Sequence, residues 1–193
     1  MEIFYTLWIV SILIWIVPPV RQFKNRYFYF FLVLSLSGII SYFLRKVFFS
    51  TSNFPFLLSA FLQIVALQNT SFRKRYNRYQ LPIMFLFLVA VVIINNRMFE
   101  LYMITFLHVI ILFYIISHFF YHNIRSKELN LFFIVLVLYQ TLSVFKFINV
   151  VVLVYDSAFF FIVTFSFQIL IGLFFCFVRP DNPKFSFKLT SKS

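Results

Sequence analysis

One lysine, Lys146, stands inside the apolar stretch 131–154. A charged side chain inside such a stretch is costly in lipid, so it is a candidate for function. Tyr139, Ser143 and Asn149 lie close to the same side of a helix, because residues three or four apart share a face. We therefore expect a polar stripe that faces the interior of a helical bundle. Lys146 has three interpretations: structural hydrogen bonding or snorkelling, a ligand or ion path, and a contact between subunits.

A histidine, His108, occupies the middle of the apolar stretch 98–121. Thr105 precedes it by one turn and Glu100 by about two turns, so both lie on a similar face. Two interpretations stay open for this residue. It is either an interior hydrogen-bonding group or a proton-linked group, because imidazole changes its charge near neutral pH.

The sequence carries no pattern of a known catalytic site. It has no G-x-S-x-G elbow, no Walker A loop and no paired carboxylates within its apolar stretches. His118 and His122 have the i, i+4 spacing at which two histidines can share a metal, but no third ligand lies near them. The single cysteine, Cys176, excludes an intramolecular disulfide and a thiolate cluster. We predict no metal, no cofactor and no enzyme.

Amide, hydroxyl and glycine residues recur at helical spacing in several apolar stretches. Thr164, Gln168 and Gly172, for example, follow one another at intervals of one turn. We expect such residues to define inward faces, where they pack through interhelical hydrogen bonds worth roughly 0.6 kcal/mol each. A weakly polar central cavity is the alternative interpretation. The residues expected to line a ligand or ion path are Lys146, His108, Gln168, Gln63, Gln140, Asn149 and Glu100.

Membrane helices must position these residues. Of the 193 residues, 63% are hydrophobic and only 11% are charged, whereas about 25% of the residues in a soluble domain are charged. Lipid offers the backbone no hydrogen-bond partner, so helices are favoured. Since a span needs about 20 apolar residues, we predict an all-α polytopic integral membrane bundle of about seven helices with no soluble domain.

The boundaries of the predicted spans follow the apolar stretches. Pro55 and Pro82, together with glutamines, dilute the third and fourth spans, so either could be tilted or partly re-entrant. The expected transmembrane bundle covers residues 1–178, and residues 179–193 form a basic tail. The expected spans are 3–20, 27–44, 54–70, 80–96, 98–121, 131–154 and 158–178.

Lysines and arginines concentrate in every second gap between these spans and in the tail. Cytoplasmic loops carry such an excess, so we expect an external N-terminus and a cytoplasmic C-terminus, in a multi-pass protein of the bacterial inner membrane. The alternation accounts for most of the net charge of +12. Nucleic acid is therefore a less favoured partner than anionic lipid or a protein. The cations expected to contact these partners are Arg73, Lys74, Arg75, Arg78, Arg21, Lys24 and Arg26.

The expected layout resembles, in topology, the membrane sensor modules of bacterial signalling proteins. This resemblance covers most of the chain and involves no motif. We predict a non-enzymatic regulatory, sensor or accessory membrane protein that acts through its basic cytoplasmic face on a signalling, secretion or defence system. The alternative is a small transporter or channel, whose path is lined by Lys146, His108 and Gln168, and a membrane enzyme ranks third. The small size of the chain favours a homo-oligomer in the first two cases.

Overall fold

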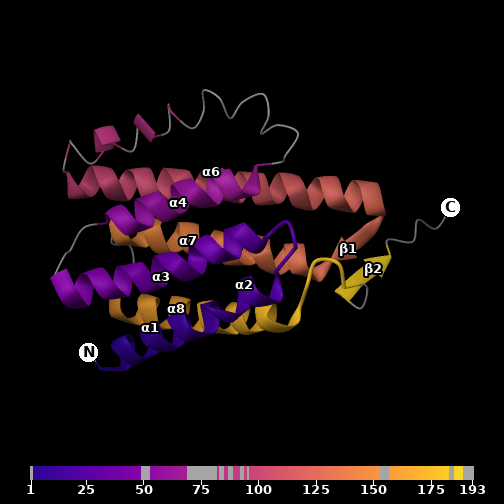
Figure 1. Cartoon of the computed structure of the whole chain (residues 1–193), viewed down its shortest axis with the longest axis horizontal. Coiled ribbons are helices and arrows are strands. Elements are labelled where there is room, and N and C mark those ends of the chain that lie inside the picture. The colour runs from indigo at the N-terminus through magenta and orange to yellow at the C-terminus, as the bar shows by residue number, and fades with distance from the viewer. Residues whose placement is uncertain are drawn as a thin grey trace.

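The computed structural model shows helices that run along the long axis of the molecule (Figure 1). The structure describes residues 2–48, 53–68, 82, 85–86, 89–91, 94, 96–152, 157–182 and 185–188. A short antiparallel ribbon pairs strand β1 (Glu128–Asn130) with strand β2 (Ser186–Lys188). The helices are α1 (Glu2–Trp15), α2 (Val17–Arg21), α3 (Phe28–Phe48), α4 (Phe54–Leu67), α6 (Arg97–Ser126), α7 (Leu131–Val152) and α8 (Ser157–Phe177).

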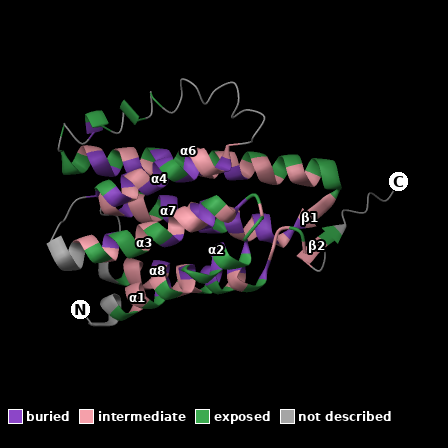
Figure 2. Ribbon diagram, viewed as in Figure 1, coloured by how far each residue is buried: buried purple, intermediate pink, exposed green. Residues whose placement is uncertain are grey.

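Six of these helices form a ring within the described part of the chain. Helix α1 packs on α3, α3 on α4, α4 on α6, α6 on α7 and α7 on α8, and α8 returns to α1. Figure 2 shows both buried and exposed residues along each long helix. This is the pattern of helices that pack through one side and present the other side to their surroundings.

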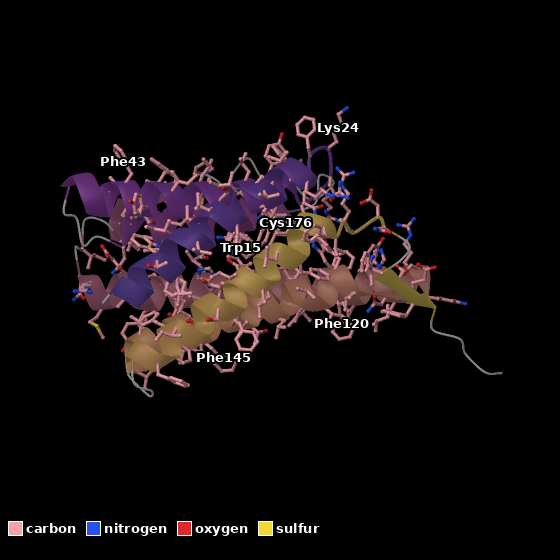
Figure 3. All side chains as sticks on the ribbon, turned by 90° about the horizontal axis from the view of Figure 1, so that it is seen from below. Trp15, Lys24, Phe43, Phe120, Phe145 and Cys176 are labelled. Carbon is pink, nitrogen blue, oxygen red and sulfur yellow. The ribbon has the colours of Figure 1, made fainter. Side chains whose placement is uncertain are left out.

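Large apolar side chains cover the outer sides of the helices. Phe43, Phe120 and Phe145 point away from the bundle (Figure 3), and each is more than half exposed. Soluble monomers rarely expose extensive apolar surface, so lipid contact explains this surface best. The helices long and apolar enough to cross a membrane are Arg97–Ser126, Leu131–Val152 and Phe159–Phe177, and the shorter apolar helices are Thr6–Arg21, Phe28–Leu44 and Phe54–Leu67.

The sequence prediction is confirmed in part. The described part of the chain is mostly helical and includes three helices that could span a membrane, and these correspond to the predicted spans 98–121, 131–154 and 158–178. A bundle of seven spans stays a prediction, because most of the predicted span 80–96 lies outside the described residues. The helical class agrees with the prediction, and the short ribbon of β1 and β2 is an addition that the sequence analysis did not predict.

The predicted first span, 3–20, is divided into α1 and α2 by a turn at Ile16. The cause is proline, because Pro18 has no amide hydrogen to donate to the carbonyl of Ile14 four residues earlier. The Cys176 thiol on α8 donates to that carbonyl instead, with an Sγ to oxygen distance of 3.8 Å. The break in α1 thus creates a hydrogen bond between the first and last helices of the ring.

Helices α1 and α8 approach each other closely at Gly172. A Cβ atom on Gly172 would lie 2.8 Å from Ile14 Cγ2 and 3.2 Å from Trp15 Nε1. Trp15 Nε1 also donates to the main-chain carbonyl of Gln168 at 3.2 Å, so the indole is tied to α8. The missing side chain at Gly172 therefore permits the contact that closes the ring, as small residues often do between membrane helices.

Most of the cationic side chains that the structure describes gather at one end of the bundle, which we call the basic end. This end is formed by α2, the end of α6, the ribbon and the segment that follows α8 (Figure 1). Nitrogen atoms cluster there near Lys24 in Figure 3. Its described cations are Arg21, Lys24, Arg26, Arg125, Lys127 and Arg179.

The segment after α8 is fastened to this basic end. Arg179 Nε donates to the carbonyl of Arg21 at 2.7 Å, and Gln22 Nε2 donates to the carbonyl of Val178 at 2.8 Å. Residues 186–188 then pair with β1. The residues that follow α8 therefore link the end of α2 to the segment between α6 and α7.

Gly172→Ala should lower the Tm of the detergent-solubilised protein, because the new methyl group would overlap Ile14. Overpacking of this kind costs about 1–3 kcal/mol. Gly38→Ala is the matched control, since its Cβ would meet Ile12 Cγ1 at 3.4 Å, an ordinary contact. Alanine also favours a helix over glycine by about 1 kcal/mol. Thermal unfolding followed by circular dichroism compares the variants, and equal Tm values would contradict the close packing of α1 and α8.

Candidate functional site

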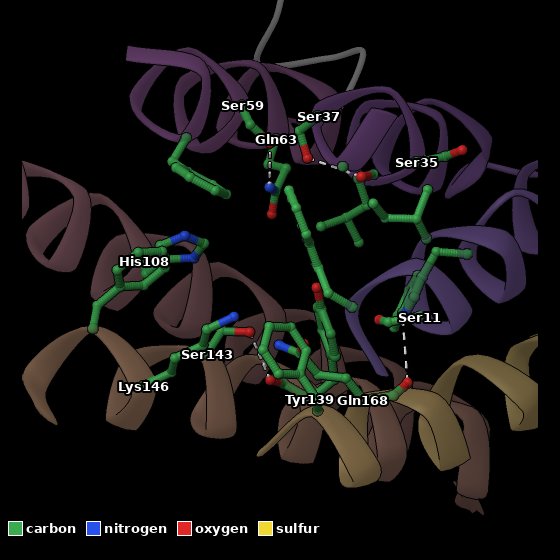
Figure 4. A pocket seen from close by; sticks show the side chains of 18 residues that line it. Ser11, Ser35, Ser37, Ser59, Gln63, His108, Tyr139, Ser143, Lys146 and Gln168 are labelled. Atoms are coloured by element: carbon green, nitrogen blue, oxygen red, sulfur yellow. Dashed lines mark hydrogen bonds between the residues drawn. The ribbon is translucent and has the colours of Figure 1, made fainter. Parts of the chain in front are cut away.

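A cavity of about 120 Å³ lies inside the ring of helices (Figure 4). Every helix of the ring contributes to its lining. A cavity of this size has room for several water molecules or for one small molecule. The polar side chains that line it are Ser11, Ser35, Ser37, Ser59, Gln63, His108, Tyr139, Ser143, Lys146 and Gln168, and the aromatic ones include Trp8, Trp15, Phe56, Phe147 and Phe165.

The cavity brings together four of the seven residues predicted for a ligand or ion path. Lipid disfavours outward-facing polar groups, so polar residues on different helices turn toward a shared interior. Gln140 lies behind His108 and bonds to it, whereas Asn149 and Glu100 are buried away from the cavity. The four residues that line the cavity are Lys146, His108, Gln168 and Gln63.

Two hydrogen bonds from Gln140 fix the protonation site of His108. Gln140 Nε2 donates to the main-chain carbonyl of His108 at 3.1 Å, and a carbonyl only accepts, so this end of the amide is the NH₂ group. The same nitrogen lies 2.8 Å from His108 Nδ1, which must therefore accept and carry no proton. The ring is consequently neutral, with its proton on Nε2. His108 can therefore donate a hydrogen bond from Nε2 as part of the cavity lining.

The ammonium group of Lys146 lies between α7 and α8. Its Nζ is 4.3 Å from the centroid of the Phe165 ring and 5.9 Å from that of Phe161. A cation above an aromatic face gains about 0.5–2 kcal/mol, which offsets part of the cost of removing the charge from water. These rings therefore help to hold the charge beside the cavity.

The amide of Gln63 has one end without a partner among the described residues. Its Nε2 donates to Ser59 Oγ at 3.0 Å, while its buried Oε1 makes no hydrogen bond. The Ser59 hydroxyl can donate as well as accept, so the amide can turn and present its NH₂ group instead. A buried amide atom without a partner costs about 1–3 kcal/mol.

An aromatic cluster of Trp15, Phe31, Phe132, Tyr139 and Phe175 separates the cavity from the basic end. Phe31, Phe132 and Phe175 lie one or two turns nearer the basic end than the lining residues of their own helices, and all three are fully buried. Ring centroids are 4.9 Å apart for Phe31 and Phe175, and 4.7 Å apart for Trp15 and Tyr139. The cluster therefore closes the cavity on this side with apolar rings.

The two histidines near the basic end have separate partners. Arg26 Nη2 donates to His118 Nε2 at 2.7 Å, since a guanidinium group only donates. His122 Nδ1 lies 3.3 Å from Ser126 Oγ. Of the cations predicted to contact lipid or a partner, Arg21, Lys24 and Arg26 lie at the basic end, and Arg73, Lys74, Arg75 and Arg78 lie outside the described residues.

The sequence prediction missed the contribution of α1 to the lining. Trp8, Ser11, Ile12 and Trp15 all line the cavity. Their spacing of i, i+3, i+4 and i+7 is that of one helix face, which is a signal that could have identified them. The neighbouring residues are almost as apolar, so hydropathy alone does not distinguish this face from the others.

Comparisons with models of protein families, with curated proteins and with solved structures give no match for this chain. Two features of the molecule therefore point to a function. One is the polar cavity inside the ring, and the other is the basic end.

Gln140→Leu should release the fixed tautomer of His108, because it removes the donor to Nδ1. An unpartnered buried nitrogen costs about 1–3 kcal/mol, so the Tm should also fall. Nitrogen-15 NMR of histidine-labelled protein should show His108 Nδ1 unprotonated in the wild type and a changed signal in the variant.

Thr141→Val is the matched control for this variant. The Thr141 hydroxyl donates to the carbonyl of Val137 in its own helix at 2.9 Å. Its removal should leave the His108 signals unchanged. A proton on Nδ1 of His108 in the wild type would contradict the assigned tautomer.

Proposed function

We propose that the chain is a multi-pass protein of a bacterial inner membrane, with about seven spans, an external N-terminus and a cytoplasmic C-terminus. Three candidate membrane helices and the apolar outer surface support a membrane location. The basic end supports the orientation, because Lys and Arg accumulate on the cytoplasmic side of membrane proteins.

Within this membrane, the protein acts as a non-enzymatic sensor or regulator that binds a small ligand in the cavity. The observation that carries this proposal is the convergence of polar residues from every helix of the ring on one cavity. The lining places a lysine beside a neutral histidine, and the described lining residues include no carboxylate. A general acid–base pair, or a nucleophile with its activating base, would usually need a different set of side chains. The lining therefore favours ligand binding over catalysis.

The ligand signal reaches the basic end through helices that form both sites. Trp15 lines the cavity and donates to the Gln168 carbonyl of α8. Near the other end of the same helix pair, Arg179 donates to the carbonyl of Arg21. A ligand that moves α8 relative to α1 would therefore move the cations that face a cytoplasmic partner or anionic lipid.

A small transporter or channel is the second candidate, because Lys146, His108 and Gln168 line one cavity. The aromatic cluster favours binding over passage, since its rings fill the space between the cavity and the basic end. Solute flux through the protein in liposomes, lost in Gln168→Leu, would favour the transporter instead.

Cysteine labelling in a Cys176→Ser background tests the orientation. Lys24 and Lys127 are exposed at the basic end, and Arg97 is exposed at the start of α6. A membrane-impermeant maleimide added to spheroplasts should label Arg97→Cys and should spare Lys24→Cys and Lys127→Cys until the membrane is opened. Labelling of Lys24→Cys in closed spheroplasts would overturn the proposed orientation.

Neutralisation of Arg73, Lys74, Arg75 and Arg78 to glutamine tests the action on a partner. We expect several-fold less of the protein that co-purifies with the wild type, because the charge attraction is lost. The matched control neutralises Arg45, Lys46 and Arg97, which lie in the alternate gaps between the predicted spans and therefore on the expected external side, and it should retain the partner. The labelling assay above confirms normal insertion of both variants. Equal recovery from both, or no specific protein with the wild type, contradicts the proposal.

A further inference from the structure

We propose that the cavity binds a carboxylate, either a small free acid or the acid group of a fatty acid from the bilayer. This inference rests on the proposed ligand-binding function and names the chemistry of the ligand. It is carried by the charge, the donors and the size of the cavity.

The charge of the lining selects a monoanion. In the described part of the chain, Lys146 is the one charged residue of the lining, and His108 is neutral because Gln140 fixes its tautomer. A bound carboxylate would place its negative charge beside this ammonium group, which is a favourable arrangement inside a membrane protein. One carboxylate matches one ammonium group, whereas a dianion such as phosphate would bring an excess charge into a low-dielectric site.

The donors of the lining suit an acceptor with two oxygen atoms. Figure 4 shows Gln63 above the cavity, Lys146 below it and His108 at its left side. The amide of Gln63 can present its NH₂ group when Ser59 donates to its oxygen, and His108 donates through Nε2. A carboxylate can accept from two sides at once, and hydrogen bonds to a charged group are stronger than those to a neutral one.

The size and walls of the cavity limit the rest of the ligand. A volume of about 120 Å³ is close to that of a cavity of about 150 Å³ that accepts benzene. Trp8, Trp15 and Phe56 provide apolar parts of the wall. The site therefore fits an acid with a short apolar body. A fatty acid fits if its chain leaves the cavity between two helices.

The two tryptophans of the chain, Trp8 and Trp15, both line the cavity, so intrinsic fluorescence reports directly on its occupant. The full chain in lipid nanodiscs is titrated with sodium butyrate, with butyramide at equal concentration and with sodium chloride. We expect a saturable change with butyrate only, because the neutral amide has the same shape and lacks the charge. Lys146→Met should weaken butyrate binding about tenfold or more, and Lys146→Arg should retain it.

Palmitate added to the nanodiscs distinguishes the two sources of the acid. Binding of palmitate without binding of butyrate supports the proposal and identifies the bilayer as the source. Binding of butyrate supports it with a free acid as the ligand. Circular dichroism checks the fold of Lys146→Met, and the comparison of butyrate with butyramide on the wild type decides the question even where that variant unfolds.

Other outcomes would overturn the carboxylate proposal without deciding the proposed sensor function, which has its own test. Equal binding of butyramide, equal binding of chloride, or unchanged butyrate binding in a folded Lys146→Met would each exclude a carboxylate, while they would retain the cavity as a binding site. No response to butyrate or palmitate would also exclude it. The proposed action of the basic face on a partner is tested separately. It is contradicted if the variants with neutralised cations still co-purify with the partner.

Discussion

The contact between α1 and α8 is the interaction on which the rest of the structure depends, because it closes the ring of helices. Gly172 allows the two backbones to approach, and Trp15 and Cys176 add hydrogen bonds across the gap. In an open ring, the inward faces of α3 to α7 would meet lipid. Each polar group on those faces would then lack a partner, which is costly in hydrocarbon.

The closed ring gives most of its polar side chains a partner and leaves some hydrogen-bonding capacity at the cavity. Gln140 satisfies His108, and aromatic rings of α8 face the ammonium of Lys146. Gln63 keeps one amide atom without a partner in the described structure. The same bilayer that drives polar groups inward thus also gathers them around one cavity, where we propose that a small molecule binds.

The sequence predicted the long helices well and the irregular segments poorly. The stretches 98–121, 131–154 and 158–178 are apolar over their whole length, so their helices begin and end near the expected residues. The stretch 3–20 is equally apolar, but its two prolines end α1 early. The ribbon was missed because β2 pairs with a segment more than fifty residues away, and such a pairing leaves no local pattern in three-residue strands.

The sequence by itself determined the helical class, the apolar outer surface and the set of polar residues that must avoid lipid, since each depends on composition and on the period of one helix. It identified Lys146, His108, Gln63 and Gln168 as members of that set. Only the tertiary structure decided that these four share a cavity, that Asn149 and Glu100 lie apart from it, and that both tryptophans belong to it. The period of a helix defines which face is polar, but the neighbour of that face depends on how all the helices pack together.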